Sequence, residues 1–123
     1  MRTDASCPFC PDGEDCLHLF LSCPRARSFW THLQLDLTAV TDIEQMWIVN
    51  PFLESNQRIR TTVLTCTLWN LWKCRNAKVF RSEDESNLQV AARCHDDLLL
   101  WSNRCSTASD KSKLVEWSNF FIA

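Results

Sequence analysis

A chain of 123 residues that is 46% hydrophobic and 11% aromatic is long and apolar enough to form one domain with a core, which excludes an intrinsically disordered protein. Its formal net charge of −2 falls far short of the strongly positive surface expected of an autonomous nucleic-acid-binding domain. The single Gly and four Pro all lie within residues 1–51, whereas a many-stranded β fold needs turn residues at short intervals. We therefore predict an all-α fold.

The first predicted element is a loop-rich zinc knuckle over residues 1–23, where the spacing reads Cys-x2-Cys-x7-His-x4-Cys. Cys7 and Cys10 place two thiolates on one tight turn, and His18 and Cys23 complete a tetrahedral set for a zinc ion (Zn²⁺). Four protein ligands leave no open position, so the predicted site is structural rather than catalytic. Cys16 is an alternative, because it lies two residues before His18 and could replace one ligand.

The cellular compartment of the protein determines whether its cysteines are expected as thiols or as disulfides. Residues 1–6 contain no apolar run that would indicate a secretory signal, and no apolar stretch is long enough to cross a bilayer. We therefore expect an intracellular protein, nuclear or cytoplasmic, with no membrane contact. The eight cysteines are then thiols or metal ligands. A secreted disulfide framework is the competing interpretation, but it leaves the tight spacing of the first cysteines unexplained.

Residues 24–123 form the helical domain, which we expect to pack with the knuckle as a single unit. Its architecture is predicted as about four helices, one of them long, because apolar residues recur at three- and four-residue steps. In chain order the apolar patterns cover residues 24–37, a short segment at 42–53, the long helix at roughly 55–82, residues 85–105, and a last segment from about Asp110.

The long helix is predicted to begin after Ser55 or Asn56 as the N-cap. Its apolar arc is wide, which indicates packing on more than one side. We therefore assign its tryptophans mostly to the core rather than to base stacking. The stripe consists of Ile59, Val63, Cys66, Trp69, Trp72, Asn76 and Val79, widened by Leu64, Leu68 and Leu71.

The end of this helix is the candidate nucleic-acid contact. Residues 41–82 carry six basic and three acidic side chains, so the middle of the chain is mildly positive. The alternative is the solvated end of a helix, where basic residues favour the C-terminal end of the helix dipole. The candidate phosphate-contacting residues are Lys73, Arg75, Asn76 and Lys78, with Arg58, Arg60 and Arg81 as further basic residues.

No catalytic set is predicted, and we expect that the protein is not an enzyme. His32 and His95 lie at no telling spacing from a nucleophile, and Asp96 and Asp97 are interpreted as a solvated helix face. The later cysteines follow no metal-ligand spacing and are interpreted as buried thiols: Cys66, Cys74, Cys94 and Cys105.

Two motifs carry a resemblance to a known family. The first runs through Cys7-Pro8-Phe9-Cys10, Glu14, His18-Leu19-Phe20, Cys23-Pro24 and Trp30. It resembles the zinc-binding domain behind the polymerase in plant non-LTR (LINE-type) retrotransposon reverse transcriptases. The second, Leu68-Trp69-Asn70-Leu71-Trp72-Lys73-Cys74-Arg75-Asn76-Ala77-Lys78-Val79-Phe80, is similar to a segment that often follows in those elements.

The chain also departs from this family. The apolar, Trp-rich segment that leads into the first cysteine there is absent, as are the polymerase Asp-Asp hairpin and a ribonuclease H acidic set. The chain therefore looks like a detached domain, truncated at its N-terminal side. The resemblance implies a non-catalytic zinc module that assists RNA or DNA binding. The alternatives are a structural or protein-interaction module with an uncovered apolar face, or a relic reading frame with no selected role.

Overall fold

The computed structural model describes residues 20–21, 23–35, 37, 40, 43–49, 52 and 54–122, and this part of the chain contains helices but no strand. The predictions of an all-α fold and of one long helix are confirmed. The described residues form five helices rather than about four: α1 (Pro24–His32), α2 (Ile43–Val49), α3 (Gln57–Arg81), α4 (Asn87–Ser102) and α5 (Ala108–Phe120).

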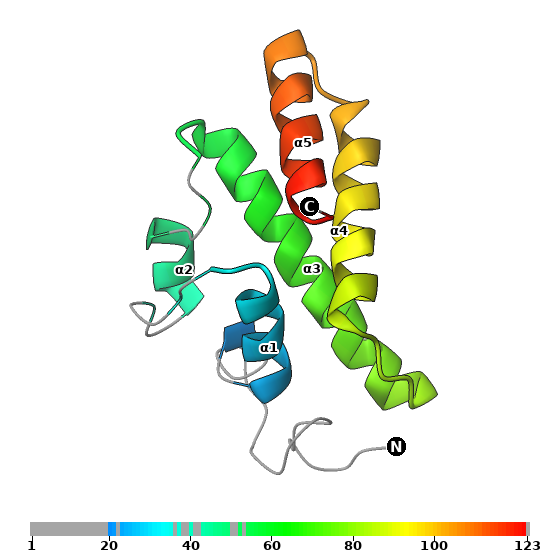
Figure 1. Cartoon of the computed structure of the whole chain (residues 1–123). Helices are drawn as coiled ribbons and strands as arrows, with labels where there is room; N and C mark the ends of the chain where they lie inside the picture. Colours follow the sequence, from blue (N-terminus) through cyan, green and yellow to red (C-terminus); the bar gives the residue numbers. More distant parts are fainter. Residues whose placement is uncertain are drawn as a thin grey trace.

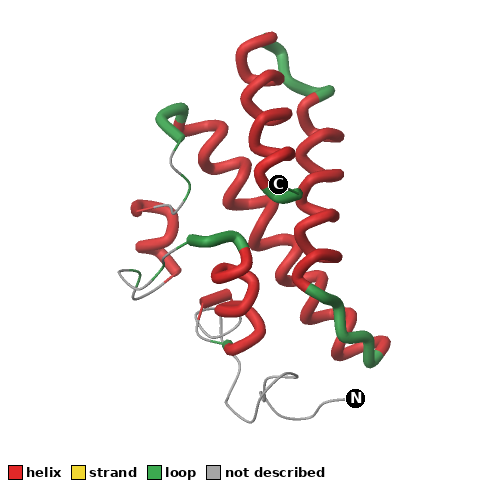
Figure 2. The backbone as a smooth tube through the Cα atoms, in the orientation of Figure 1, coloured by secondary structure: helices red, strands yellow, loops and turns green. Residues whose placement is uncertain are grey.

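The long helix α3 lies at the centre of the arrangement (Figure 1). Helices α4 and α5 form an antiparallel hairpin that packs on one side of α3, while α1 and α2 lie on the other side (Figures 1 and 2). None of the described helices combines the length and apolar character that crossing a bilayer requires.

The first helix is shorter than the sequence predicted. Helix α1 begins at Pro24, whose missing N–H is one that a first helical turn leaves unpaired in any case. It ends at His32 rather than near residue 37, because Gln34 takes a left-handed backbone conformation with φ of 61°. Helix α2 covers Ile43–Val49, within the predicted segment 42–53.

Helix α3 is capped at both ends by polar side chains and backbone. The side-chain oxygen of Asn56 accepts hydrogen bonds from the backbone N–H groups of Arg58 and Ile59, which confirms Asn56 as one of the two predicted N-caps. At the other end Ser82 is left-handed, with φ of 54°, and its N–H donates to the Lys78 carbonyl. This left-handed residue ends the helix one position before the predicted limit.

The two C-terminal helices begin at similar polar signals. Ser86 and Gln89 form a reciprocal capping box at the start of α4, which covers Asn87–Ser102 rather than the predicted residues 85–105. The Thr107 hydroxyl accepts from the backbone N–H of Asp110 and starts α5 two residues before the predicted position. These local caps determine where α4 and α5 begin.

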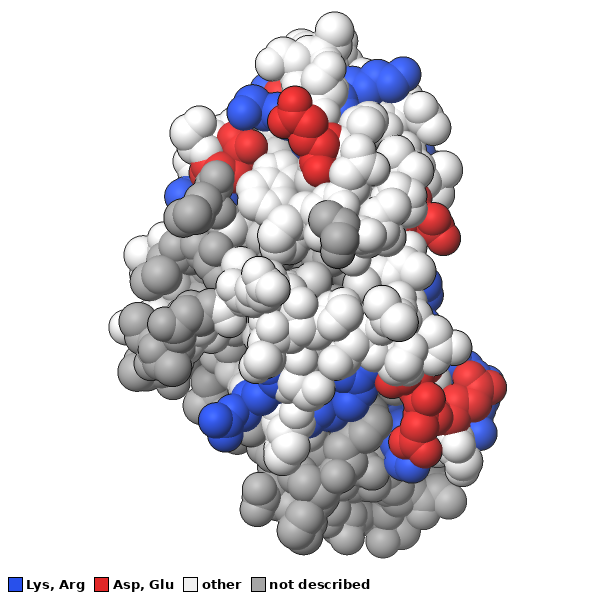
Figure 3. Space-filling view, in the orientation of Figure 1, with Lys and Arg blue, Asp and Glu red and all other residues white. Residues whose placement is uncertain are grey.

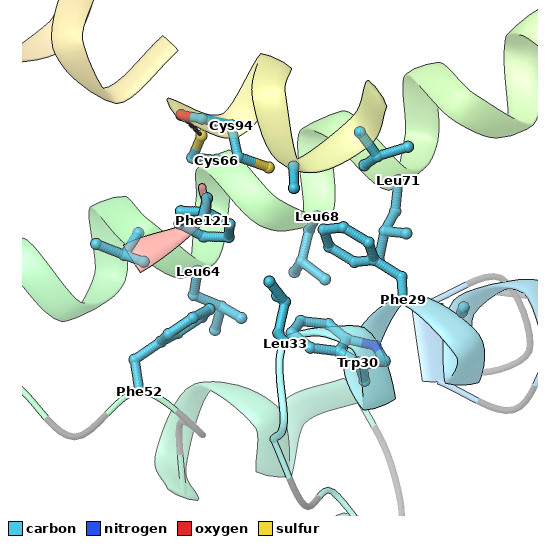
Figure 4. Packing of buried hydrophobic residues seen from close by; sticks show 14 of the residues in the cluster. Phe29, Trp30, Leu33, Phe52, Leu64, Cys66, Leu68, Leu71, Cys94 and Phe121 are labelled. Carbon is cyan, nitrogen blue, oxygen red and sulfur yellow. Dashed lines mark hydrogen bonds between the residues drawn. The ribbon is translucent and has the colours of Figure 1, made fainter. Parts of the chain in front are cut away.

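The core lies where α1, the α2–α3 connector and the hairpin meet α3. Figure 4 shows Phe29 and Trp30 of α1 facing leucine side chains of α3, including Leu68 and Leu71. Phe52 of the connector is 1% exposed. Its ring contacts aromatic rings from both sides of the molecule, with centroid distances of 5.4 Å to Trp117, 6.1 Å to Phe121, 6.2 Å to Phe120 and 6.4 Å to Trp30.

A buried carboxylate fastens the start of α3 to α5. Glu54 accepts hydrogen bonds from the backbone N–H of Asn56 at 2.8 Å, from Lys113 Nζ at 3.1 Å and from Trp117 Nε1 at 3.1 Å. The hydrogen bond from Asn56 is the main reason why the pKa of Glu54 is lowered below its ordinary value of 4.5, against the opposing effect of burial. The charged carboxylate is therefore the form that the fold stabilises at neutral pH.

Candidate zinc knuckle and nucleic-acid face

The predicted zinc site falls mostly outside the described residues. Cys7, Cys10 and His18, and the alternative ligand Cys16, all lie there, so the zinc site stays a prediction. Cys23 is described: it is almost completely buried and occupies the N-cap position of α1. Among the described residues no group of three or more His, Cys, Asp or Glu side chains is arranged to hold a metal ion.

The segment that follows the predicted ligand His18 is attached to α1. Trp30 is buried in the core, and its indole Nε1 donates a hydrogen bond to the backbone carbonyl of Phe20 at 2.8 Å. Leu21, next in the chain, is also buried in the core cluster. Phe20 and Leu21 are therefore part of the same packed unit as the helices.

One face of α3 is directed toward α4 and contains a buried amide. Asn70 is completely buried, and its Nδ2 donates to Asp97 Oδ2 at 3.0 Å and to the Cys66 carbonyl at 2.9 Å. The Asn70 side-chain oxygen accepts from Arg93 Nε at 3.0 Å, and the Asn70 backbone carbonyl accepts from Arg93 at 3.1 Å. All polar atoms of this side chain are thus paired, as burial requires.

This network extends to the junction of α3, α4 and α1. Arg93 also donates to Glu85, which lies in the connector between α3 and α4. The Glu85 carbonyl accepts from Arg25 of α1 at 2.8 Å, and Arg25 donates to the Asn87 side chain at 2.5 Å. The network therefore links α3 to α4, to the connector between them and to α1.

Helix α3 also carries two cations held on aromatic rings. Lys73 Nζ lies 5.5 Å from the centroid of the Trp69 ring, one helical turn earlier. The Arg75 guanidinium carbon lies 5.1 Å from the centroid of the Trp72 ring, and Arg75 also donates to the Asn76 side chain at 3.0 Å. Both distances are within the range for attraction between a cation and a ring face.

The remaining basic residues at the end of α3 are neutralised locally. Lys78 pairs with Asp84 at 2.8 Å, and Arg81 pairs with Glu83 at 3.2 Å. Figure 3 shows the corresponding mixture of positive and negative side chains near the end of α3, separated by an uncharged band from a second mixed group at the other end of the molecule. Of the four predicted phosphate contacts, Lys78 would have to exchange Asp84 for a phosphate.

Three tryptophan side chains line an apolar groove beside these cations. On α3 its residues follow a spacing of three and four, so they share one helix face. Trp69 is 48% exposed and Trp47 42% exposed, so the prediction that placed Trp69 in the core is wrong. The groove has a volume of about 420 Å³ and is lined by Phe20, Trp47, Thr65, Leu68, Trp69 and Trp72.

The cysteines that follow Cys23 are free thiols. Cys66, Cys74 and Cys94 are buried and Cys105 is partly buried, and none of them forms a disulfide. Burial raises the pKa of the Cys74 thiol, and the contact with the Cys66 thiol together with burial raises that of Cys94. Figure 4 shows Cys66 and Cys94 at the contact between α3 and α4. The prediction of buried thiols is confirmed for the first three.

His95 and Asp97 connect neighbouring helices. His95 Nδ1 lies 2.9 Å from the Ser118 carbonyl, which connects α4 to α5. Asp96 is exposed, as predicted for a solvated helix face, whereas Asp97 accepts the hydrogen bond from Asn70 and is part of the network at the contact between α3 and α4. The interpretation of both aspartates as solvated was therefore wrong for Asp97.

Sequence analysis missed two parts of this site. A single Asn among Leu, Trp and Cys in the middle of α3 was the available signal for the buried amide, since an amide in such a run needs partners. The groove depends on Phe20 and Trp47, which no spacing on α3 could have indicated. Comparison with protein-family models, with curated proteins and with solved structures finds no match to this chain.

Proposed function

We propose that this chain is a retroelement-derived, non-catalytic zinc-binding module that assists the binding of RNA or DNA. The observation that carries the proposal is the pair of cations held on tryptophan faces, Lys73 on Trp69 and Arg75 on Trp72. Nucleic acids offer the matching chemistry, because they combine an anionic backbone with flat aromatic bases. The resemblance of the Cys7–Cys23 and Leu68–Phe80 motifs to the reverse-transcriptase zinc domain supports the same function.

The cations in this half of α3 differ in how accessible their charge is. No acidic side chain in the part of the chain that the structure describes lies within ion-pairing distance of Lys73. Lys78 and Arg81 each have an acidic partner, so a phosphate would compete with Asp84 or Glu83 there. We therefore assign the main phosphate contact to Lys73, with Arg75, Asn76 and Lys78 beside it.

We expect neutralising Lys73 and Arg75 to reduce the affinity for nucleic acid and its salt dependence. The double variant Lys73→Gln/Arg75→Gln should lower the slope of log K against log salt by about 1.4 for single-stranded RNA, at about 0.7 for each phosphate contact. Fluorescence anisotropy with a labelled oligonucleotide at several salt concentrations measures both quantities. The control is Arg104→Gln/Lys111→Gln, which removes the same charge from exposed positions on the hairpin.

An unchanged slope in the first variant, or equal losses in both, would mean that α3 is not the contact surface. Absence of any binding by the unmodified protein at low salt would remove the nucleic-acid function altogether. A loss of affinity in Lys73→Gln/Arg75→Gln but not in Arg104→Gln/Lys111→Gln would mean that the position of the two charges, and not only the net charge, determines binding.

We further propose that zinc is held by Cys7, Cys10, His18 and Cys23 and stabilises the folded state. Elemental analysis of the purified protein should give about one zinc per chain. Because a structural zinc contributes its binding energy to folding, removal by a chelator should lower the melting temperature by about 10 °C or more. Circular dichroism during heating measures the shift.

Single substitutions identify the zinc ligands. Cys10→Ser should abolish the stoichiometric zinc, while Cys105→Ser, which changes a partly buried thiol beyond α4, should leave it unchanged. Cys16→Ser should also retain zinc, and loss of zinc in that variant would make Cys16 the ligand in place of one of the four. Protein without zinc and with an unchanged melting curve after chelation would contradict the metal site.

A second function is favoured by the groove itself, whose lining is almost entirely apolar. Such a surface is also typical of a protein-interaction module in which zinc only supports folding. A protein partner would bury the groove without needing Lys73 or Arg75. The charge variants above therefore separate the two functions.

A further inference from the structure

The groove beside α3 has features that the phosphate contacts alone do not require. Its six lining residues come from three separate segments: Phe20 before α1, Trp47 on α2, and Thr65, Leu68, Trp69 and Trp72 on α3. Three of these six are tryptophans, and the two most exposed present about half of their surface to solvent. An exposed set of aromatic faces on a rigid helix is a platform for stacking flat rings.

The charges lie beside this platform rather than within it. Lys73 and Arg75 each follow a groove tryptophan by one helical turn and are held over its ring, whereas the lining itself contains no charged residue. A ligand that fits this arrangement has an uncharged aromatic part for the groove and an anionic part next to it. A nucleotide of a flexible strand has this division between base and phosphate.

We infer that the groove binds a single-stranded nucleic acid, with a base stacked against Trp69 and the adjoining phosphates beside Lys73 and Arg75. The inference rests on the proposed function and specifies its ligand. In a duplex the bases are already stacked on one another and paired, so a duplex offers only its backbone to this surface. Stacking on aromatic rings tolerates every base, and weak sequence preference is therefore expected.

The groove has the size and support that such a site requires. Its volume of about 420 Å³ falls within the range of about 300–1,000 Å³ that is usual for small-ligand sites. The network of Asn70, Arg93 and Asp97 joins α3 to α4, so the helix that carries Trp69 and Trp72 is held in place without the ligand. A helix that is already held in place loses less conformational entropy when the ligand binds.

The test compares a labelled 12-nucleotide oligo-uridine with a duplex RNA of equal length, using the full zinc-loaded chain at low salt. We expect the single strand to bind at least about tenfold more tightly than the duplex. Trp69→Ala should weaken single-strand binding by about tenfold or more, which is the usual loss of one stacked base. Trp69→Phe keeps a smaller aromatic ring and should retain most of the affinity.

The matched control is Phe80→Ala, which removes another exposed aromatic ring from α3, 73% exposed and outside the groove lining. It should leave single-strand binding unchanged. Because Trp69 is half-exposed, Trp69→Ala should fold, and its circular dichroism melting curve checks this. If Trp69→Ala nevertheless unfolds, Trp69→Phe can be compared with Trp69→Leu, which retains apolar bulk but loses the aromatic face.

Several outcomes would overturn the inference, and they differ from failure of the proposed function. Equal binding of duplex and single strand, with loss in Lys73→Gln/Arg75→Gln but not in Trp69→Ala, leaves nucleic-acid binding in place and removes base stacking. If Trp69→Ala leaves single-strand binding unchanged but abolishes self-association of the chain, measured by sedimentation, then the groove is a protein interface. Absence of binding to either nucleic acid removes both the function and the inference.

Discussion

Replacing Asn70 with alanine is expected to destabilise the protein by about 2–4 kcal/mol. Asn70 is completely buried and hydrogen bonds to Asp97, to Arg93 and to the Cys66 carbonyl. The substitution removes the amide to which both the Asp97 carboxylate and the Arg93 guanidinium hydrogen bond. When a charged group in a partly buried position loses its hydrogen-bond partner, the protein loses more stability than the hydrogen bond itself contributed.

Denaturant unfolding followed by circular dichroism measures this loss. Asn76→Ala is the matched control, since it removes the same amide from a half-buried position on the same helix, and it should cost less than about 1 kcal/mol. The double-mutant cycle of Asn70→Ala with Asp97→Ala should give a coupling energy of about 1 kcal/mol or more. Additive effects would mean that the amide and the carboxylate do not stabilise each other.

Phe52→Ala is expected to cost about 3–5 kcal/mol, the usual range for removing a large buried aromatic ring. Phe52 contributes the ring that joins the two sides of the core, since it contacts Trp30 of α1 and also Trp117 and Phe120 of α5. No single neighbouring side chain can fill the resulting cavity, because the contacting rings come from different elements. The melting temperature should therefore fall by well over 10 °C, if the variant folds at all.

Phe80→Ala serves as the comparison for Phe52→Ala in thermal melting. It removes the same ring from a position that is 73% exposed, and should change stability by less than about 0.5 kcal/mol. Phe52→Leu retains most of the apolar volume and should show a smaller loss than Phe52→Ala. Equal effects of Phe52→Ala and Phe80→Ala would contradict the central position of Phe52 in the core.

The start of a helix could be predicted closely where a nearby capping residue determines it. Asn56 and Ser86 are polar caps directly before apolar periodic runs, so the starts of α3 and α4 are determined by a few neighbouring residues. The end of α1 could not be predicted in this way. Gln34 takes its left-handed conformation without a Gly or Asn to signal it, and apolar residues such as Leu35 and Leu37 continue the pattern past the end of the helix.

The candidate site could be predicted only in part. The basic residues on α3 follow from sequence, but their partners do not: Lys78 pairs with Asp84, whereas Lys73 lies on the Trp69 ring. Apolar residues surround much of α3, so the pattern alone does not tell which tryptophan faces the core and which faces solvent. The decision depends on where α1 and α2 pack, and this is a tertiary property.

The zinc knuckle remains a prediction from spacing and resemblance, because Cys7, Cys10 and His18 lie outside the described residues. What the structure adds is the surroundings of Cys23, the fourth predicted ligand. Cys23 is buried at the start of α1, next to the core that contains Leu21 and Trp30. A metal held there would be coupled directly to the packing of the helical domain.

The aromatic cluster around Phe52 also has a consequence for the order in which the protein can fold during synthesis. The Phe52 ring contacts Trp117, Phe120 and Phe121, which the ribosome adds much later than Phe52 itself. Until then the Phe52 ring lacks most of its aromatic neighbours. The α4–α5 hairpin, in contrast, joins neighbours in sequence and can form as soon as it emerges, so closure of the core around Phe52 awaits the synthesis of α5.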